Sequence, residues 1–122
     1  MVGTLRAGLL GTDLLLASRL RQALRGEGLG LVEATGGDLL PPLPVVFVDL
    51  NHEPESRVEA IARLRSRNPS ATIVGFCDHG ETNLMRRAKE AGADRVIANR
   101  NLAEAAVRLV RASMPGGPLD ER

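Results

Sequence analysis

The sequence predicts a three-layer, doubly wound α/β domain built around a five-stranded parallel sheet. Two observations predict this fold class: apolar β-type runs alternate with runs of helical period, and the connections between them are short. The length of 122 residues supports one compact domain with a single core. We place this domain at residues 1–114 and a flexible tail at 115–122, where proline, glycine and charged residues dominate.

The first part of the domain contains two strands and one full helix. Leu5–Leu10 forms the first strand and Leu29–Ala34 the second. Asp13 is a suitable N-cap for the helix between them, and apolar residues at helical spacing line its inner face, namely Leu16, Leu20, Ala23 and Leu24. Prolines are dense after the second strand, so we expect a shortened second helix of one turn at most.

The second part repeats the strand–helix alternation. Val45–Leu50 is apolar without alternation, which is typical of a central strand buried on both faces. Pro54 suits the first turn of the next helix, whose inner side carries Val58, Ile61 and Leu64. The remaining elements are a strand at Thr72–Cys77, a helix at Glu81–Ala91 with Leu84, Met85 and Ala88 inward, a strand at Arg95–Ala98 and a helix at Leu102–Met114.

Composition excludes several function classes. A net charge of +1 argues against a general nucleic-acid binder, and 2% aromatic residues leave no stacking platform for single strands. A single cysteine, Cys77, excludes a disulfide framework and a cysteine-based zinc site, and it favours a reducing compartment. Apolar runs are short and the N-terminus lacks a signal-peptide pattern, so we expect a cytoplasmic protein without a membrane segment.

Chemistry in this fold class takes place at one edge of the sheet. Ligands bind outside the carboxyl ends of parallel strands, near the point where the strand order reverses. This rule selects the residues at and just after the carboxyl ends of the predicted strands. They are Gly11, Thr12 and Asp13; Asp49, Leu50, Asn51 and His52; Cys77, Asp78 and His79; and Asn99 and Arg100.

Three local features resemble the receiver domain of bacterial response regulators. Val45–Asp49 resembles the third strand, which ends in the phosphoacceptor aspartate; Ala91-Gly92-Ala93-Asp94 resembles the turn before the fifth strand; and Gly11-Thr12-Asp13 lies where the family has its acidic cluster. The resemblance spans residues 4–114. It implies a strand order of 2-1-3-4-5 and a phosphoacceptor-like role for Asp49.

The resemblance also implies functional positions that this chain has altered. The family holds Mg²⁺ with two acids after the first strand, and these positions fall on Gly11 and Thr12, with Asp13 next. The catalytic lysine position falls on Asn99 and the switch hydroxyl position on Cys77. Lys89 is the single lysine among 16 basic residues and lies within a predicted helix, so no plausible register shift restores the missing cation.

We therefore expect a degenerate receiver, or pseudo-receiver, that acts through protein–protein interaction rather than as an enzyme. Its partner would be another signalling protein or a second copy, with no nucleic acid, no membrane and no cofactor. Mg²⁺ would bind weakly at most, through Asp13 and Asp49. One alternative is a phosphorylatable regulator that uses Asp49 with an atypical metal shell of Asp13 and Asp78. Another is a small nucleotide- or ligand-binding domain.

Further hypotheses concern the same edge. Cys77-Asp78-His79 could supply a nucleophilic cysteine with a base, although adjacent residues on a strand point to opposite faces and a small buried cysteine is the simpler interpretation. A metal could instead be held by Asp49, Asp78, His52 and His79. Gly8–Asp13 has glycines of a nucleotide-binding turn but lacks the third glycine, and Glu33 is a loose match for the ribose-binding acid. Asp13 as a helix cap is preferred over Asp13 as a metal ligand.

Two groups of arginines lie on predicted helices. The helix that starts at Pro54 carries the first group, which we expect to form a solvated face whose positive charge is offset by Glu55 and Glu59. This group consists of Arg57, Arg63, Arg65 and Arg67. Receivers commonly dock partners through the fourth helix, fifth strand and fifth helix. By that resemblance a basic interface for an acidic partner or a charge-paired dimer would consist of Arg86, Arg87, Arg95, Arg108 and Arg111.

Overall fold

The computed structural model describes residues 6–36 and 40–113, which form one sheet with helices on both faces. The strands are β1 (Arg6–Leu10), β2 (Gly30–Ala34), β3 (Val45–Asp49), β4 (Thr72–Cys77) and β5 (Arg95–Ala98). The helices are α1 (Leu14–Arg25), α2 (Pro54–Arg67), α3 (Thr82–Ala91) and α4 (Leu102–Ser113), and a 3-10 turn at Asn99–Asn101 precedes α4. No helix of the described residues is both long and apolar enough to cross a membrane.

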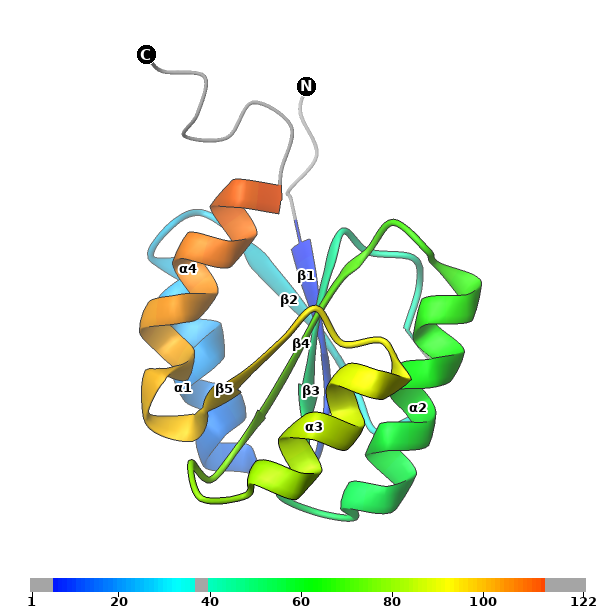
Figure 1. The fold of residues 1–122 in the computed structure, drawn as a ribbon. Coiled ribbons are helices and arrows are strands. Elements are labelled where there is room, and N and C mark those ends of the chain that lie inside the picture. The colour runs from blue at the N-terminus through cyan, green and yellow to red at the C-terminus, as the bar shows by residue number, and fades with distance from the viewer. Residues whose placement is uncertain (1–5, 37–39, 114–122) are drawn as a thin grey trace.

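The sheet is fully parallel and has the strand order β2-β1-β3-β4-β5. This confirms the predicted architecture and strand order. Helices α1 and α4 lie side by side on one face, and α2 and α3 cover the other (Figure 1). All strands run the same way, so their carboxyl ends and the loops that follow gather at one edge, which is where the candidate site lies.

The central strand β3 divides the core into two layers. Its residues are all at most 3% exposed, as predicted for a strand buried on both faces. Val45 and Phe47 pack in the cluster with α1 and α4, whereas Val46 and Val48 pack in the cluster with α2 and α3. The strict alternation follows from the two-residue period of a strand. Because the strand is buried on both faces, its last residue, Asp49, has a fixed position at the carboxyl edge of the sheet.

The connection between β2 and β3 covers the sheet beside α2. Among its described residues there is no helix, and residues 37–39, where part of the expected short second helix could fall, lie outside the described ranges. Leu40 and Leu43 are buried against β1, and a Cβ added to Gly8 would lie 2.9 Å from the Leu43 Cδ1 atom. The glycine in β1 therefore makes room for apolar side chains that shield this part of the sheet.

Within the described ranges, some helix and strand boundaries differ from the predicted ones, each by one residue. β2 begins at Gly30 because the Leu29 amide still donates to the Leu24 carbonyl, which belongs to the end of α1. β3 ends at Asp49, and α3 begins after Glu81, its N-cap. Leu5, Met114 and the predicted tail 115–122 lie outside the described residues.

The prediction that the α2 arginines form a solvated face is wrong for two of them. Arg57 is 5% exposed and donates from Nη1 to the Thr35 carbonyl at 2.8 Å. The Arg65 guanidinium donates to backbone carbonyls of the segments that precede β4 and β5. Charge counting missed both because the flexible arginine stem can lie along apolar surface while its head bonds to backbone carbonyls. Arg63 and Arg67 are exposed, as expected.

Candidate functional site

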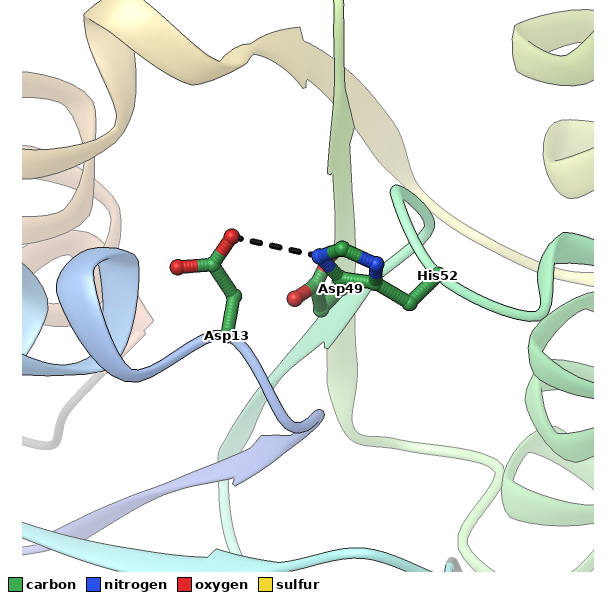
Figure 2. Close-up of side chains that lie close together, drawn as sticks. All are labelled: Asp13, Asp49 and His52. Carbon is green, nitrogen blue, oxygen red and sulfur yellow. Dashed lines mark hydrogen bonds and ion pairs between the residues drawn. The ribbon is translucent and has the colours of Figure 1, made fainter.

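Three side chains that can bind a metal converge at the carboxyl edge of the sheet. Asp49 ends β3, His52 follows it in the β3–α2 loop, and Asp13 lies in the β1–α1 loop (Figure 2). One ligand atom from each lies within 4.8 Å of those of the other two. Asp49 is buried, Asp13 is partly exposed and His52 is exposed. The parallel topology brings together residues that are distant in the sequence.

The Asp49 carboxylate is fixed by the residue two positions later. Its Oδ1 atom accepts hydrogen bonds from the Asn51 backbone N–H at 2.8 Å and from the Asn51 Nδ2 at 2.7 Å. Its Oδ2 atom lies toward Gly11, where an added Cβ would be 3.2 Å from Oδ2 and only 2.5 Å from the Asp49 Cβ. The β1–α1 loop thus packs its backbone directly on Asp49. An acidic side chain at position 11 has no room in this conformation.

Asp13 has two roles that use different oxygens. The predicted N-cap of α1 is confirmed, because Oδ1 accepts from the Leu16 N–H at 3.0 Å. Oδ2 lies 3.3 Å from Nε2 of His52 (Figure 2). The backbone hydrogen bond from Leu16 is the largest cause that lowers the pKa of Asp13; burial opposes it and His52 adds to it. The neighbouring Thr12 is exposed.

Asn99, at the position where the resemblance places a lysine, forms a neutral amide network. Its Nδ2 donates to the Asn51 Oδ1 at 2.8 Å, and the Asn51 Nδ2 donates back to the Asn99 Oδ1 at 3.0 Å. The Asn99 Nδ2 also lies 2.9 Å from the Asp78 Oδ1, which accepts from it. Amide groups, with no formal charge, therefore connect the ends of β3, β4 and β5.

Sequence reasoning found the edge but not this network. The hypothesis of a metal site from Asp49, Asp78, His52 and His79 names two residues of the observed cluster, which has Asp13 in place of the other two. Asp78 is engaged by Asn99 instead. The available signal for Asn51 was its position two residues after Asp49, from which a short amide can bond back to the carboxylate.

Gly8–Asp13 is explained by packing rather than by phosphate binding. Gly8 makes room for Leu43 and Gly11 for Asp49, and both close contacts involve protein side chains. Neither glycine has a positive φ. The glycines that suggested a nucleotide-binding turn are therefore accounted for by the core and the Asp49 pocket.

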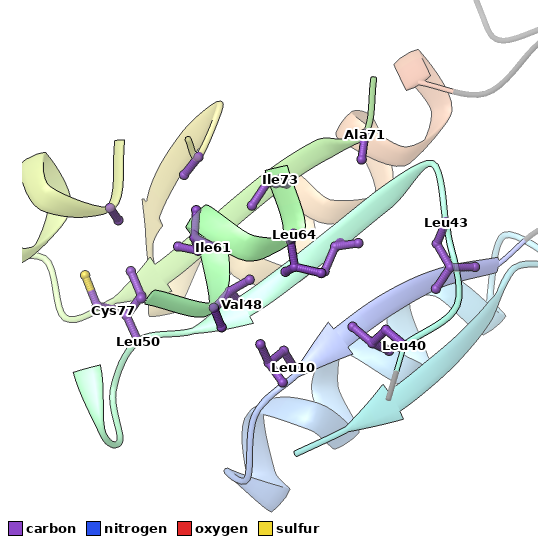
Figure 3. Close-up of a cluster of buried hydrophobic side chains, with 14 of the residues drawn as sticks. Leu10, Leu40, Leu43, Val48, Leu50, Ile61, Leu64, Ala71, Ile73 and Cys77 are labelled. Atoms are coloured by element: carbon purple, nitrogen blue, oxygen red, sulfur yellow. The ribbon is translucent and has the colours of Figure 1, made fainter. Parts of the chain in front are cut away.

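Cys77 lies inside the core at the end of β4, beside Leu50 in the cluster that α2 and α3 cover (Figure 3). It is 1% exposed. Burial, reinforced by the nearby Glu81, Asp78 and Asp49 carboxylates, raises the pKa of its thiol from 9.0 to about 11. A thiol that stays protonated and buried lacks the properties of a nucleophile. The interpretation as a small buried residue holds.

Alkylation kinetics will measure this protection. At pH 8 we expect iodoacetamide to react with Cys77 in the folded protein at least about 100-fold more slowly than in urea, since raising the pKa by two units lowers the thiolate fraction about 100-fold. Burial slows the reaction further, because it requires opening of the fold. Mass spectrometry over time gives both rates. Equal rates in the two states would contradict the buried, protonated thiol.

The predicted basic interface is interrupted by carboxylates. Arg86 pairs with Glu90 within α3, at 3.1 Å. Arg87 pairs with Glu55 of α2, and Arg111 pairs with Glu27 after α1. Arg95 and Arg108 line a shallow surface hollow together with Glu104. Three of the five arginines thus have acidic partners, and the other two share their hollow with a carboxylate.

The sheet order and the helices on both faces match the fold of response-regulator receiver domains. A CheY-like protein (TadZ) from Pseudomonas aeruginosa superimposes with a TM-score of 0.78, at 21% identity, over 91% of this chain and 100% of its own. The signal receiver domain of an HD domain-containing protein from Pseudomonas fluorescens gives 0.77 at 17% identity, over 93% and 88%. An orphan response regulator from H. pylori gives 0.74 at 19% identity, over 93% and 98%.

Comparison of sequences gives a match that covers less of the chain than the structural matches do. No family model matches the chain. A cyclic di-GMP phosphodiesterase from Thermotoga maritima is 28% identical over 80 residues, which is 62% of this chain. The matched stretch spans only 22% of that relative's length. The likeness therefore concerns one part of a much longer protein.

Proposed function

We propose that the chain is a pseudo-receiver: a cytoplasmic signalling module that acts through contact with another signalling protein or a second copy, without normal phosphorylation of Asp49. It is not an enzyme in this proposal. The observation that carries it is the neutral network of Asn99 with Asn51 and Asp78, located where receivers, by resemblance, have a lysine. The receiver fold supports the assignment to signalling.

The physical argument concerns the charge of the phosphoryl group. Transfer to a carboxylate concentrates negative charge on the transferred oxygens, and cations aimed at those oxygens stabilise it. At this edge Asn99 and Asn51 offer amide dipoles that are already bonded to each other. Gly11 offers no side chain, and its contact with Asp49 leaves no space for one. Both changes weaken phosphotransfer to Asp49.

An apolar patch beside the site supports action through protein contact. Leu14 and Leu15, the first residues of α1, are 83% and 62% exposed. They follow Asp13 directly, so the patch adjoins the carboxyl edge of the sheet. Large apolar side chains left adjacent in solvent are a common feature of surfaces that bind other proteins.

Treatment with acetyl phosphate tests the proposal. After incubation with acetyl phosphate and Mg²⁺, we expect no phosphoryl adduct in the intact-mass spectrum of the native protein, and none in that of an Asp49→Ala variant. A receiver with all its functional residues serves as the positive control in the same reaction. A stoichiometric adduct that disappears in Asp49→Ala would show that the chain is phosphorylated and would overturn the proposal.

One observation favours a second candidate, a phosphorylatable regulator with an unusual metal shell. Asp13, Asp49 and His52 lie close enough to share a cation. Asp78, the other acid considered for this shell, is bonded to Asn99. Under this candidate the adduct would form with acetyl phosphate and would decrease strongly in Asp13→Asn, which keeps a capping side chain on α1.

A further inference from the structure

The Mg²⁺ that the receiver fold implies does not suit the residues present. Mg²⁺ requires near-octahedral oxygen coordination, and carboxylates and water are its usual ligands. Here one of the three converging ligands is the imidazole of His52, and position 11 has no room for another acid. Imidazole nitrogen suits zinc, copper, nickel and iron, whereas oxygen-only sets suit magnesium and calcium.

We infer that Asp13, Asp49 and His52 form a binding site for a divalent transition metal of the Zn²⁺ type, selective against Mg²⁺. This goes beyond the proposed function, since it requires neither phosphorylation nor a partner. Two carboxylates and a neutral imidazole give the set a charge that balances a divalent cation. Because a mixed oxygen and nitrogen set is a common environment for zinc, the chemistry of the ligands matches the metal.

The distances agree with this assignment. The Asp13 Oδ2 and His52 Nε2 atoms are 3.3 Å apart. Two ligands of a tetrahedral zinc ion, each bonded at about 2.0 Å, are separated by about 3.3 Å. The Asp49 ligand atom lies within 4.8 Å of both. His52 is exposed at 54% of its side chain, so a rotation of its ring can complete the approach without disturbing the core.

Hydrogen bonds from outside the cluster orient both carboxylates. The Leu16 N–H holds Oδ1 of Asp13, whose Oδ2 lies beside His52, and Asn51 holds Oδ1 of Asp49, which leaves Oδ2 without a hydrogen bond from Asn51. Fixing ligands in this way is a feature of metal sites and raises their affinity. Asn99 keeps Asp78 engaged elsewhere. With three protein ligands, a tetrahedral zinc ion would take a water as its fourth ligand.

Calorimetric titration of the metal-free protein tests the site directly. We expect Zn²⁺ to bind with one equivalent per chain and with a Kd at least about 100-fold lower than that of Mg²⁺. His52→Ala should weaken Zn²⁺ binding at least about 10-fold, and Asp13→Asn by a similar factor. The matched control is His79→Ala, because His79 is the second of the chain's two histidines and is also exposed at the same edge.

Co²⁺ gives a readout that does not depend on affinity alone. Addition of Co²⁺ to the native protein should produce visible absorption bands of a nitrogen-ligated ion of low coordination number, and these should be absent in His52→Ala and present in His79→Ala. Mg²⁺ binding as tight as that of Zn²⁺, no Zn²⁺ binding, or an equal loss in both histidine variants would each overturn the inference. Circular dichroism of the His52→Ala, His79→Ala and Asp13→Asn variants checks that each of them remains folded. Phosphorylation is measured separately, so the two proposals can fail independently.

Discussion

Replacement of Arg65 by methionine is expected to lower the free energy of unfolding by about 2–4 kcal/mol, because it leaves several carbonyl groups without their donor. Arg65 donates to the Gly92 carbonyl from Nε at 3.1 Å and from Nη2 at 2.8 Å. Nη1 donates to the carbonyls of Pro69 at 2.9 Å and Ala71 at 2.8 Å. The methionine keeps much of the stem, so the change removes mainly the hydrogen bonds.

The position of these contacts explains why they matter for the whole sheet. The Arg65 Nη2 also lies 2.6 Å from Oδ2 of Asp94, which in turn accepts from the Ile73 N–H at 2.8 Å. Gly92 has a φ of 128° and packs against the Arg65 stem, where an added Cβ would lie 2.9 Å from the Arg65 Cβ. One guanidinium thus joins the segment before β4 to the segment before β5.

Urea unfolding followed by circular dichroism measures the effect. The control is Arg63→Met, a change on the exposed side of the same helix that should alter the free energy of unfolding by less than about 0.5 kcal/mol. Arg65→Lys should recover only part of the loss, because an ammonium group lacks the fork that reaches several carbonyls at once. Equal stabilities of Arg65→Met and Arg63→Met would contradict a structural role for this arginine.

The fold was predictable because its signals are local and repeated. An apolar run such as Val45–Asp49 and an N-cap such as Asp13 determine an element from a few adjacent residues. Five such units leave few arrangements, since parallel crossovers are right-handed. Arg57 and Arg65 were misplaced because most of their hydrogen bonds go to backbone carbonyls, and no pattern of residue types identifies those.

The site was predictable only in part. The rule that ligands collect at the carboxyl edge selected Asp13, Asp49 and His52 correctly as neighbours of that edge. Which of the candidates meet depends on loop geometry: Asn99 turns toward Asn51 and Asp78, and His52 toward Asp13. These contacts depend on side-chain directions in loops, which have no sequence period. The resemblance located the altered positions, and the structure shows which contacts the residues at these positions make.

Gly11→Ala is expected to lower the free energy of unfolding by about 1–3 kcal/mol, the usual cost of forcing extra volume into a packed site. The added Cβ would lie 2.5 Å from the Asp49 Cβ, closer than carbon atoms approach without displacement. Asp49 cannot easily yield, since it is 2% exposed and is fixed by the hydrogen bonds from Asn51. Urea unfolding gives the magnitude.

Gly80→Ala is the matched control, because an added Cβ there meets nothing within 4 Å and should change stability by less than about 0.5 kcal/mol.

The close contact between Gly11 and Asp49 also bears on function. Gly11→Asp would put back an acid that receivers have by resemblance, yet its Cβ meets the same contact, so we expect it to destabilise the fold and to leave Mg²⁺ binding weak. A Gly11→Asp variant that is as stable as the native protein and binds Mg²⁺ tightly would contradict this expectation. It would show that the β1–α1 loop moves away from Asp49 readily. The acid pocket would then be absent because one side chain is missing, and not because the backbone packs on Asp49.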